Sequence, residues 1–154
     1  MIDLDDIDRA LLRALAKDAT INAGVLGRQH GLSQPATWRR IKRLQDAKVL
    51  VGRRVRLDRE ALGFGVTVFL GIKLATKGRV SLDDFERAVA SIPEVQLVQH
   101  VLGLYDYRLR VVARDLSDFE RVLRRRIMTL PGVGNVEANV LLSEERLPGP
   151  LGTL

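Results

Sequence analysis

The chain has 154 residues, which suits one compact domain or two small ones. Hydrophobic residues make up 46% of it and charged residues 29%, a balance that favours a packed core and argues against wholesale disorder. It contains no cysteine, which excludes disulfides, thiolate zinc sites and thiol catalysis, and its net charge of +6 indicates an anionic partner.

The first segments of the chain predict two helices. Residues 5–17 place leucine and isoleucine at helical spacing with charges between them, and Asp3 or Asp5 can cap this helix. Asn22 can cap a second, short helix over residues 23–30. The beginning of the chain therefore reads as helical.

A third helix is predicted over residues 34–46. Gly31 ends the second helix, because glycine reaches positive φ without strain, and Ser33 is a strong N-cap for the third. A helix, a turn that contains glycine and a basic second helix have the spacing of a helix-turn-helix motif.

The outward face of the third helix carries the expected DNA contacts. In a helical projection, Ile41 and Leu44 form an apolar seam that can pack on the first two helices. The cations opposite this seam are Arg39, Lys42 and Arg43, with Arg40 on a flank. Trp38 lies at the edge of both faces, so a partly buried position and a DNA contact both stay open. The residues expected at the major groove are Ser33, Gln34, Trp38, Arg39, Arg40, Lys42 and Arg43.

A basic stretch continues beyond this helix. Residues 39–56 hold eight Lys/Arg and one acidic residue, Asp46, which indicates a phosphate footprint, the alternative being a solvated basic face. Residues 49–57 alternate with a period of two, which predicts a short strand or wing. This wing would bring Arg53, Arg54 and Arg56 to the DNA backbone. We expect a helix-turn-helix domain over 1–59 and a hinge over 60–65.

The second half of the chain alternates strand and helix signals. Strands are predicted over 66–74, 95–101, 107–113 and 136–142, and helices over 81–92, where Ser81 opens a capping-box pattern, and from Ser117 or Asp118 to 130. The order βαββαβ is ferredoxin-like. The expected fold class is α+β: an N-terminal winged helix-turn-helix followed by a ferredoxin-like βαββαβ regulator domain over 66–145, with a loose tail over 146–154. Both helices of such a domain cover one sheet face, and we expect the other to be rich in apolar side chains and to find a partner.

Four motifs, in this order, resemble the Lrp/AsnC family of bacterial and archaeal regulators, also called feast/famine regulators. They are LDDIDRALLRAL, GLSQPATWRRIKRLQDAKVL, GLYDYRLRV and LPGV, and the resemblance spans residues 3–145. It implies a sequence-specific transcription regulator whose C-terminal domain dimerises through its sheets. It also implies dimers that join into larger assemblies, commonly octamers, and small effectors that bind between regulator domains.

A short turn carries the expected effector contacts. Gly103, Tyr105 and Asp106 match the family's Gly-x-Tyr-Asp turn, so the resemblance implies that they bind the effector. The alternative is a structural β-turn in which Asp106 bonds the backbone. Positions near the family pocket that are often hydroxylated or charged are apolar here: Leu102, Leu104, Val136 and Ala138. Because a buried zwitterion needs partners at both ends, we expect weak or no binding of small polar amino acids, and an apolar amino acid or related acid as any effector.

An enzyme is the main alternative class, because the two-domain plan also resembles the sirohaem decarboxylases. Those enzymes need a pocket rich in His and Arg, which this sequence does not show. His30 and His100 fall in different predicted domains, which disfavours a shared metal or proton-transfer site. We expect no catalysis, no cofactor and no metal. With no apolar leader and no membrane-length apolar stretch, the expected protein is a cytoplasmic regulator that binds double-stranded DNA and itself.

Overall fold

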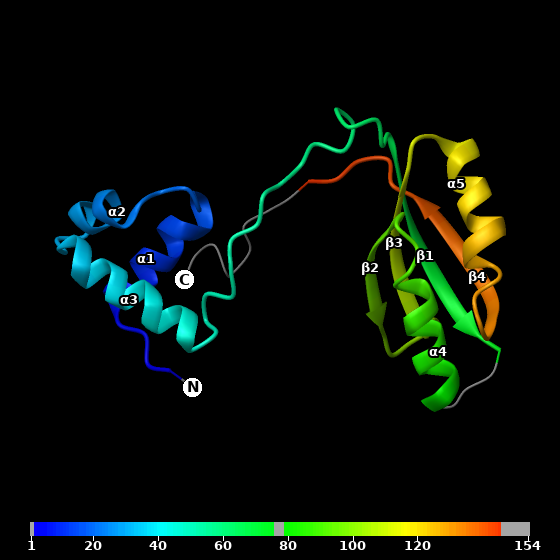
Figure 1. Cartoon of the computed structure of the whole chain (residues 1–154), viewed down its shortest axis with the longest axis horizontal. Helices are drawn as coiled ribbons and strands as arrows, with labels where there is room; N and C mark the ends of the chain where they lie inside the picture. Colours follow the sequence, from blue (N-terminus) through cyan, green and yellow to red (C-terminus); the bar gives the residue numbers. More distant parts are fainter. Residues whose placement is uncertain (1, 76–78, 146–154) are drawn as a thin grey trace. The chain divides into compact units, whose positions relative to one another are not determined.

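The computed structural model describes residues 2–75 and 79–145, in two compact units that divide after Arg56 (Figure 1). The second unit is Leu57–Glu144, so the predicted hinge at 60–65 belongs to that unit. Within it, residues 58–64 form a brief turn, closed by bonds such as Phe64 N–H to the Arg59 carbonyl at 2.8 Å. The predicted tail at 146–154 lies outside the described residues.

The N-terminal unit consists of three helices, as predicted. They are α1 (Asp6–Lys17), α2 (Ala23–Gln29) and α3 (Gln34–Asp46). Leucine and isoleucine side chains from all three meet in a small core formed by Leu11, Leu15, Leu26 and Ile41. The side chains of Asp5, Asn22 and Ser33 accept backbone N–H bonds in the first turns of α1, α2 and α3, which confirms these caps.

Two glycines shape the turn between α2 and α3. Gly31 has a φ of 67°, in the left-handed region that favours glycine. A Cβ atom on Gly27 would lie 2.5 Å from Thr37 Oγ1 and 2.8 Å from the carbonyl oxygen of Leu32. Only a residue without a side chain therefore lets α2 approach α3 this closely.

No wing strand follows α3, so the strand predicted over residues 49–57 is wrong. Residues 51–58 have no regular structure, and Val51 and Val55 are exposed. A strand needs a neighbour to bond, and the described residues of the N-terminal unit include no other strand. The alternating pattern therefore has no surface to pack against.

The second unit is a four-stranded antiparallel sheet in the order β2-β3-β1-β4, which confirms the ferredoxin-like arrangement. The strands are β1 (Val66–Leu74), β2 (Val95–His100), β3 (Tyr107–Ala113) and β4 (Val133–Val140). The helical elements are α4 (Arg79–Val89), α5 (Leu116–Val122) and a π-helical turn η1 (Leu123–Ile127) that continues α5. Figure 1 shows α4 and α5 packed on this sheet.

One sheet face holds the core. Leu70 of β1 pairs with Leu109 of β3, and both are buried with Phe85 of α4 and Phe119 of α5. Because successive residues of a strand point to opposite faces, both helices cover the face formed by the alternate, apolar positions.

The opposite sheet face, here called the open face, is less apolar than expected. Most apolar side chains of β1 and β3 form the core instead, and the register leaves Phe69 and Val112 on the open face. The strand register places a mixture of apolar, charged and amide side chains on the open face, among them Phe69, Leu97, Gln99, Arg108, Arg110, Glu137 and Asn139.

Several predicted boundaries in this unit are wrong: α4 ends at Val89 and β4 at Val140, not at 92 and 142, and three elements start earlier than expected. α4 begins at Arg79, so Ser81 lies inside the helix instead of capping it. α5 is capped by Asp115, which accepts the Asp118 N–H at 2.7 Å, earlier than the Ser117 or Asp118 start. β4 begins at Val133, because pairing with Leu74 of β1 extends it beyond its own strand signal.

Candidate nucleic-acid interface and effector site

Helix α3 divides into a buried and an exposed face. Thr37, Ile41 and Leu44 are buried, and Arg39 and Lys42 are exposed on the other side. Trp38 is 57% exposed on one flank, so of its two alternatives the core position is wrong. The projection from sequence therefore gave the correct seam.

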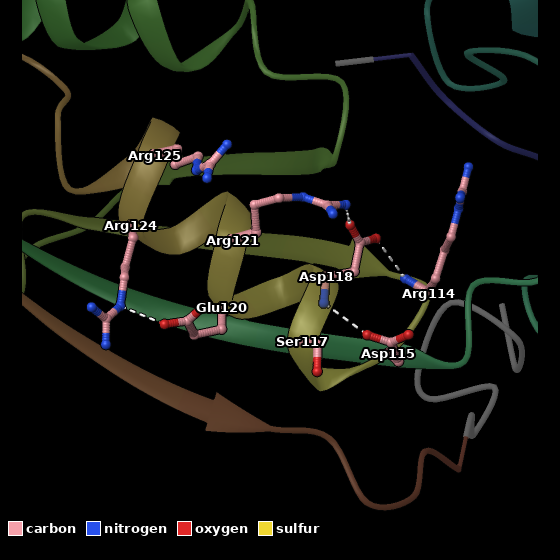
Figure 2. A pocket seen from close by; sticks show the side chains of 8 residues that line it. All are labelled: Arg114, Asp115, Ser117, Asp118, Glu120, Arg121, Arg124 and Arg125. Carbon is pink, nitrogen blue, oxygen red and sulfur yellow. Dashed lines mark hydrogen bonds and ion pairs between the residues drawn. The ribbon is translucent and has the colours of Figure 1, made fainter.

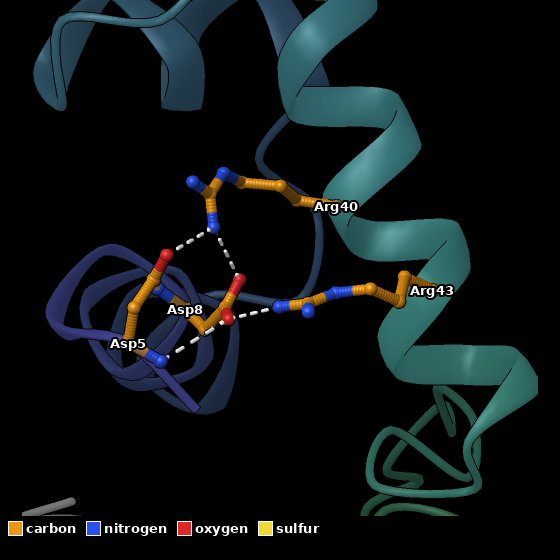
Figure 3. A network of polar contacts seen from close by, with 4 residues as sticks. All are labelled: Asp5, Asp8, Arg40 and Arg43. Atoms are coloured by element: carbon orange, nitrogen blue, oxygen red, sulfur yellow. Dashed lines mark hydrogen bonds and ion pairs between the residues drawn. The ribbon is translucent and has the colours of Figure 1, made fainter. Parts of the chain in front are cut away.

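The other flank of α3 is tied to α1 by a buried carboxylate (Figure 3). Arg40 Nη1 donates to Asp5 Oδ2 at 2.7 Å and to Asp8 Oδ1 at 2.9 Å. The guanidinium of Arg43 bonds the second oxygen of Asp8, whose side chain is fully buried. Arg43 is exposed, as predicted for an outward residue, but its guanidinium also reaches back to α1, which the sequence did not predict.

The contacts in this cluster favour the charged forms of Asp5 and Arg40. The backbone N–H of Asp8, and then the guanidinium of Arg40, hold the pKa of Asp5 below its usual range. The carboxylates of Asp5 and Asp8 raise the pKa of Arg40. Sequence reasoning missed Asp8, although its place three residues after the cap Asp5 is that of the second residue of a capping box, which the structure shows here.

The remaining predicted DNA contacts fall in two places. Ser33 and Gln34 lie exposed at the start of α3, on the helix that also presents Arg39 and Lys42. Arg53, Arg54 and Arg56 are exposed in the irregular segment after α3 and are not gathered into a wing.

The Gly103–Asp106 turn is bonded to the sheet. It joins the edge strand β2 to the central strand β3. The Asp106 N–H donates to the carbonyl oxygen of Ile72 at 2.9 Å, and its carboxylate accepts the Leu74 N–H at 2.9 Å. Lys73 Nζ lies 3.4 Å from the same carboxylate. These contacts match the alternative of a structural β-turn in which Asp106 bonds the backbone.

Tyr105 covers the neighbouring strand. Its ring lies so close to Gly71 that a Cβ atom there would be 2.7 Å away. Its hydroxyl donates to Glu137, which raises the pKa of Tyr105 and lowers the pKa of Glu137. The apolar positions predicted near the pocket are not gathered together, since Leu102 and Leu104 are exposed and Val136 packs against the core.

Arg110 on the open face has an unsatisfied donor. Its Nε is buried and has no hydrogen-bond partner among the described residues. Its guanidinium carbon lies 5.9 Å from the centre of the Phe69 ring, and its Nη2 lies 3.7 Å from a Glu144 oxygen. A buried donor without an acceptor is unfavourable, so this position favours the approach of a further acceptor.

Within the described part of the chain, no group of His, Asp and Glu side chains is arranged to hold a metal ion. Among the same residues, no helix combines the length and apolar character needed to cross a membrane.

Comparisons with known proteins match both units. Residues 4–45 match the AsnC-type helix-turn-helix domain, and residues 67–148 match the Lrp/AsnC ligand binding domain. The chain belongs to the Lrp/AsnC family. It is 32% identical over 141 residues to the DNA-binding transcriptional activator DecR of Escherichia coli (strain K12), covering 92% of this chain and 93% of that protein. It is 33% identical to the Bkd operon transcriptional regulator of Pseudomonas aeruginosa over 147 residues, 96% of each protein.

Solved structures share the two-unit plan of this Lrp/AsnC protein. An AsnC family transcriptional regulator from Agrobacterium tumefaciens has a TM-score of 0.84 at 30% identity, over 94% of each chain. A regulator from Neisseria meningitidis, solved as a complex with L-Met, has a TM-score of 0.88 over 94% of each chain at 24% identity, which shows the shared fold.

This Lrp/AsnC chain is therefore a DNA-binding transcription regulator with a ligand-binding domain. The family and the relatives named above are regulators and not enzymes, so the decarboxylase-like alternative has no support.

Proposed function

We propose that this regulator reads its operator with α3 in the major groove, through Ser33, Gln34, Trp38, Arg39 and Lys42. The observation that carries this proposal is the division of α3 into a buried face and an exposed, cationic one. Arg39 forms no ion pair with any residue that the structure describes, so its planar guanidinium is available to the edge of a guanine.

The flanking cations have a different part in this proposal. Arg40 and Arg43 fix the position of α3 against α1, and their remaining N–H groups, which are partly exposed, face phosphates. Arg53, Arg54 and Arg56 supply phosphate contacts from the irregular segment that follows α3. A regulator of transcription acts where the DNA lies, so we infer a cytoplasmic location.

Capture of bound DNA across the genome, followed by gel shifts on the best site, tests this proposal. Arg39→Ala and Lys42→Ala should each cost about 1–3 kcal/mol on the operator if they contact bases, or weaken all duplexes alike and flatten the salt dependence if they contact phosphates. Arg87→Ala, which removes an exposed cation of α4, is the matched control. Unchanged affinity in both α3 variants would show that α3 does not read DNA.

We also propose that two copies pack through the open face. The support is the buried, unpartnered Nε of Arg110 beside Phe69 and the exposed Leu97, which an acceptor and an apolar surface of a second copy would satisfy. Two-fold symmetry then requires a roughly palindromic operator, with half-sites about one helical turn or a multiple apart. Association of such dimers gives the larger assemblies, up to octamers, that the family resemblance implies.

The effector proposal follows from the turn at residues 103–106. Since Asp106 and Tyr105 are engaged within the chain, we propose that Gly103, Tyr105 and Asp106 hold the turn, and that any effector is an apolar amino acid or related acid. Thermal-shift screening should then show small or no shifts with serine and aspartate, and larger ones with methionine, branched or aromatic acids. A ligand raises the stability by RT ln(1 + [L]/Kd), so a clear shift with serine or aspartate would contradict the proposal.

A further inference from the structure

A groove of about 550 Å³ runs beside α5 and η1, and none of its lining residues belongs to the two sites described above. Four arginines line it, namely Arg114, Arg121, Arg124 and Arg125, together with acidic and hydroxyl side chains (Figure 2). No aromatic side chain takes part in its lining. The groove therefore offers guanidinium groups and hydrogen bonds, and little apolar surface.

The acidic side chains of the groove are already bonded. Asp118 bonds the guanidinium of Arg121 and accepts the backbone N–H of Arg114 at 3.1 Å. Asp115 caps α5 through the Asp118 N–H. Asp118 is therefore paired, whereas Asp115 accepts one backbone bond, and the groove holds three carboxylates against its four guanidinium groups.

Two of the arginines form no close ion pair among the described residues, although Arg114 is near enough to Asp118 to help lower the pKa of that carboxyl. Glu120 takes Arg124 at 2.5 Å, but the side chains of Arg114 and Arg125 form no ion pair with any described residue. Both residues are exposed, and Figure 2 shows them on the same side of α5 as Arg121. In Figure 2 they stand towards opposite ends of the site, with Arg121 between them, so a ligand that bonds both must span the groove.

The backbone beneath these side chains is unusual. The Met128 N–H donates to the carbonyl oxygen of Leu123, five residues earlier, at 2.9 Å, which defines the π-helical turn. Three consecutive arginines, Arg124 to Arg126, lie on this turn. π-Helical turns are rare, and they occur frequently at functional sites, so the turn is a second observation in favour of a site here.

We propose that this groove binds the phosphate groups of a polyanion, with Arg114 and Arg125 as its primary contacts. The planar fork of a guanidinium matches phosphate oxygens bidentately, and several guanidiniums around one open groove favour a multiply charged ligand over a single carboxylate. Without an aromatic side chain to stack on a base, the groove recognises phosphates only. The phosphates come either from the backbone of bound DNA or from a free polyphosphate.

The test compares the full chain with Arg114→Gln/Arg125→Gln, and uses Arg87→Gln as the control for loss of an exposed cation elsewhere. Calorimetric titration with inorganic tripolyphosphate measures the free anion, and gel shifts with operator and random duplexes measure DNA. We expect the double variant to bind either tripolyphosphate or the duplexes about tenfold more weakly or worse, because each charge-assisted hydrogen bond contributes substantially to affinity. Circular dichroism checks that the double variant is folded. If it is not, Arg125→Gln alone replaces it in both binding measurements.

The pattern of loss identifies the source. If the groove binds the DNA backbone, the affinity of the double variant for both duplexes falls equally. The slope of log affinity against log salt then flattens by about 2, one unit per lost phosphate contact. For a free polyphosphate, tripolyphosphate binding is lost and DNA affinity is unchanged. The proposal would be overturned if the folded variant bound tripolyphosphate and both duplexes as tightly as the wild type does. It would also be overturned if the wild type did not bind tripolyphosphate and the variant had unchanged affinity for DNA. Neither result bears on α3, whose variants are measured on the operator separately.

Discussion

Single side chains decide how the DNA-binding unit holds its recognition helix. Asp8 is fully buried on α1, and it receives bonds from both Arg40 and Arg43 of α3. A buried carboxylate without such partners would be strongly unfavourable, so the two arginines and Asp8 depend on each other. A basic residue on a recognition helix is therefore not automatically a DNA contact.

The pH dependence of this cluster is a first prediction. The folded-state pKa of Asp5 is lowered, so its ionised form stabilises the unit above its ordinary pKa of 3.8, and this stability is lost as the pH falls through the lowered value. Asp5→Asn keeps a residue that caps helices well but removes the ionisation. Urea unfolding should show a wild-type advantage at pH 6 that shrinks below about pH 4. A difference that is constant across this range would contradict the assignment.

Asp106 provides a second prediction at this scale. Its side chain is 16% exposed and accepts the N–H of Leu74, a buried residue. Asp106→Ala should lower the free energy of unfolding of the regulator unit by about 1–3 kcal/mol, since the buried amide loses its acceptor. Tyr105→Phe, which removes only an exposed hydroxyl bond to Glu137, should cost less. Equal stability of Asp106→Ala and wild type would favour a ligand-binding role instead.

At the scale of elements, the approach of α2 to α3 fixes the helix-turn-helix geometry. Gly27 faces Thr37 and Leu32 at distances that leave no room for a side chain, and the buried hydroxyl of Thr37 donates to the carbonyl oxygen of Ser33 at 3.0 Å. The two helices are thus positioned by a close contact as well as by the apolar core.

A pair of glycine substitutions on α2 tests this contact. Gly27→Ala should destabilise the N-terminal unit by about 1–3 kcal/mol, because its Cβ would overlap Thr37 Oγ1 and the Leu32 carbonyl. Gly24→Ala is the matched control: its nearest contact would be 3.3 Å, and alanine favours a helix more than glycine does. Thermal unfolding of the two variants compares them directly. If both behaved alike, the close approach of α2 to α3 would not limit this position.

For the whole molecule, the boundary between the units determines which fragment can be studied alone. Arg59 Nη1 donates to Thr67 Oγ1 at 2.7 Å, and its Nη2 lies 3.7 Å from Glu144 Oε2. A fragment that begins at residue 60 loses these contacts, whereas one that begins at Leu57 keeps them.

Dimerisation through the open face can be tested with a fragment and with a charge reversal. A fragment of residues 57–154 should be a dimer by light scattering at micromolar concentration, without the DNA-binding unit. Arg110→Glu should shift the full chain towards monomer, because it places a carboxylate beside the ring of Phe69 where the proposed interface has a cation. Arg87→Glu on α4 is the control. A monomeric fragment would refute the open face as the interface.

The sequence by itself determined the helices of the N-terminal unit, their caps and the order of strands and helices in the regulator domain. These features depend on residues close together in the chain: the spacing of apolar side chains, the polar residue before each helix and the glycine after it. The turn at Gly31 and the seam of Ile41 and Leu44 on α3 were found in this way.

Only the tertiary structure decided which partner each side chain meets. Arg43 bonds Asp8, 35 residues earlier, and Tyr105 bonds Glu137, 32 residues later. The segment at 49–57 has the alternation of a strand but no neighbour to pair with, and most apolar residues of β1 and β3 lie under the helices, with Phe69 and Val112 on the open face. Local patterns fix the period and the ends of an element, whereas burial and pairing depend on which distant surface folds against it.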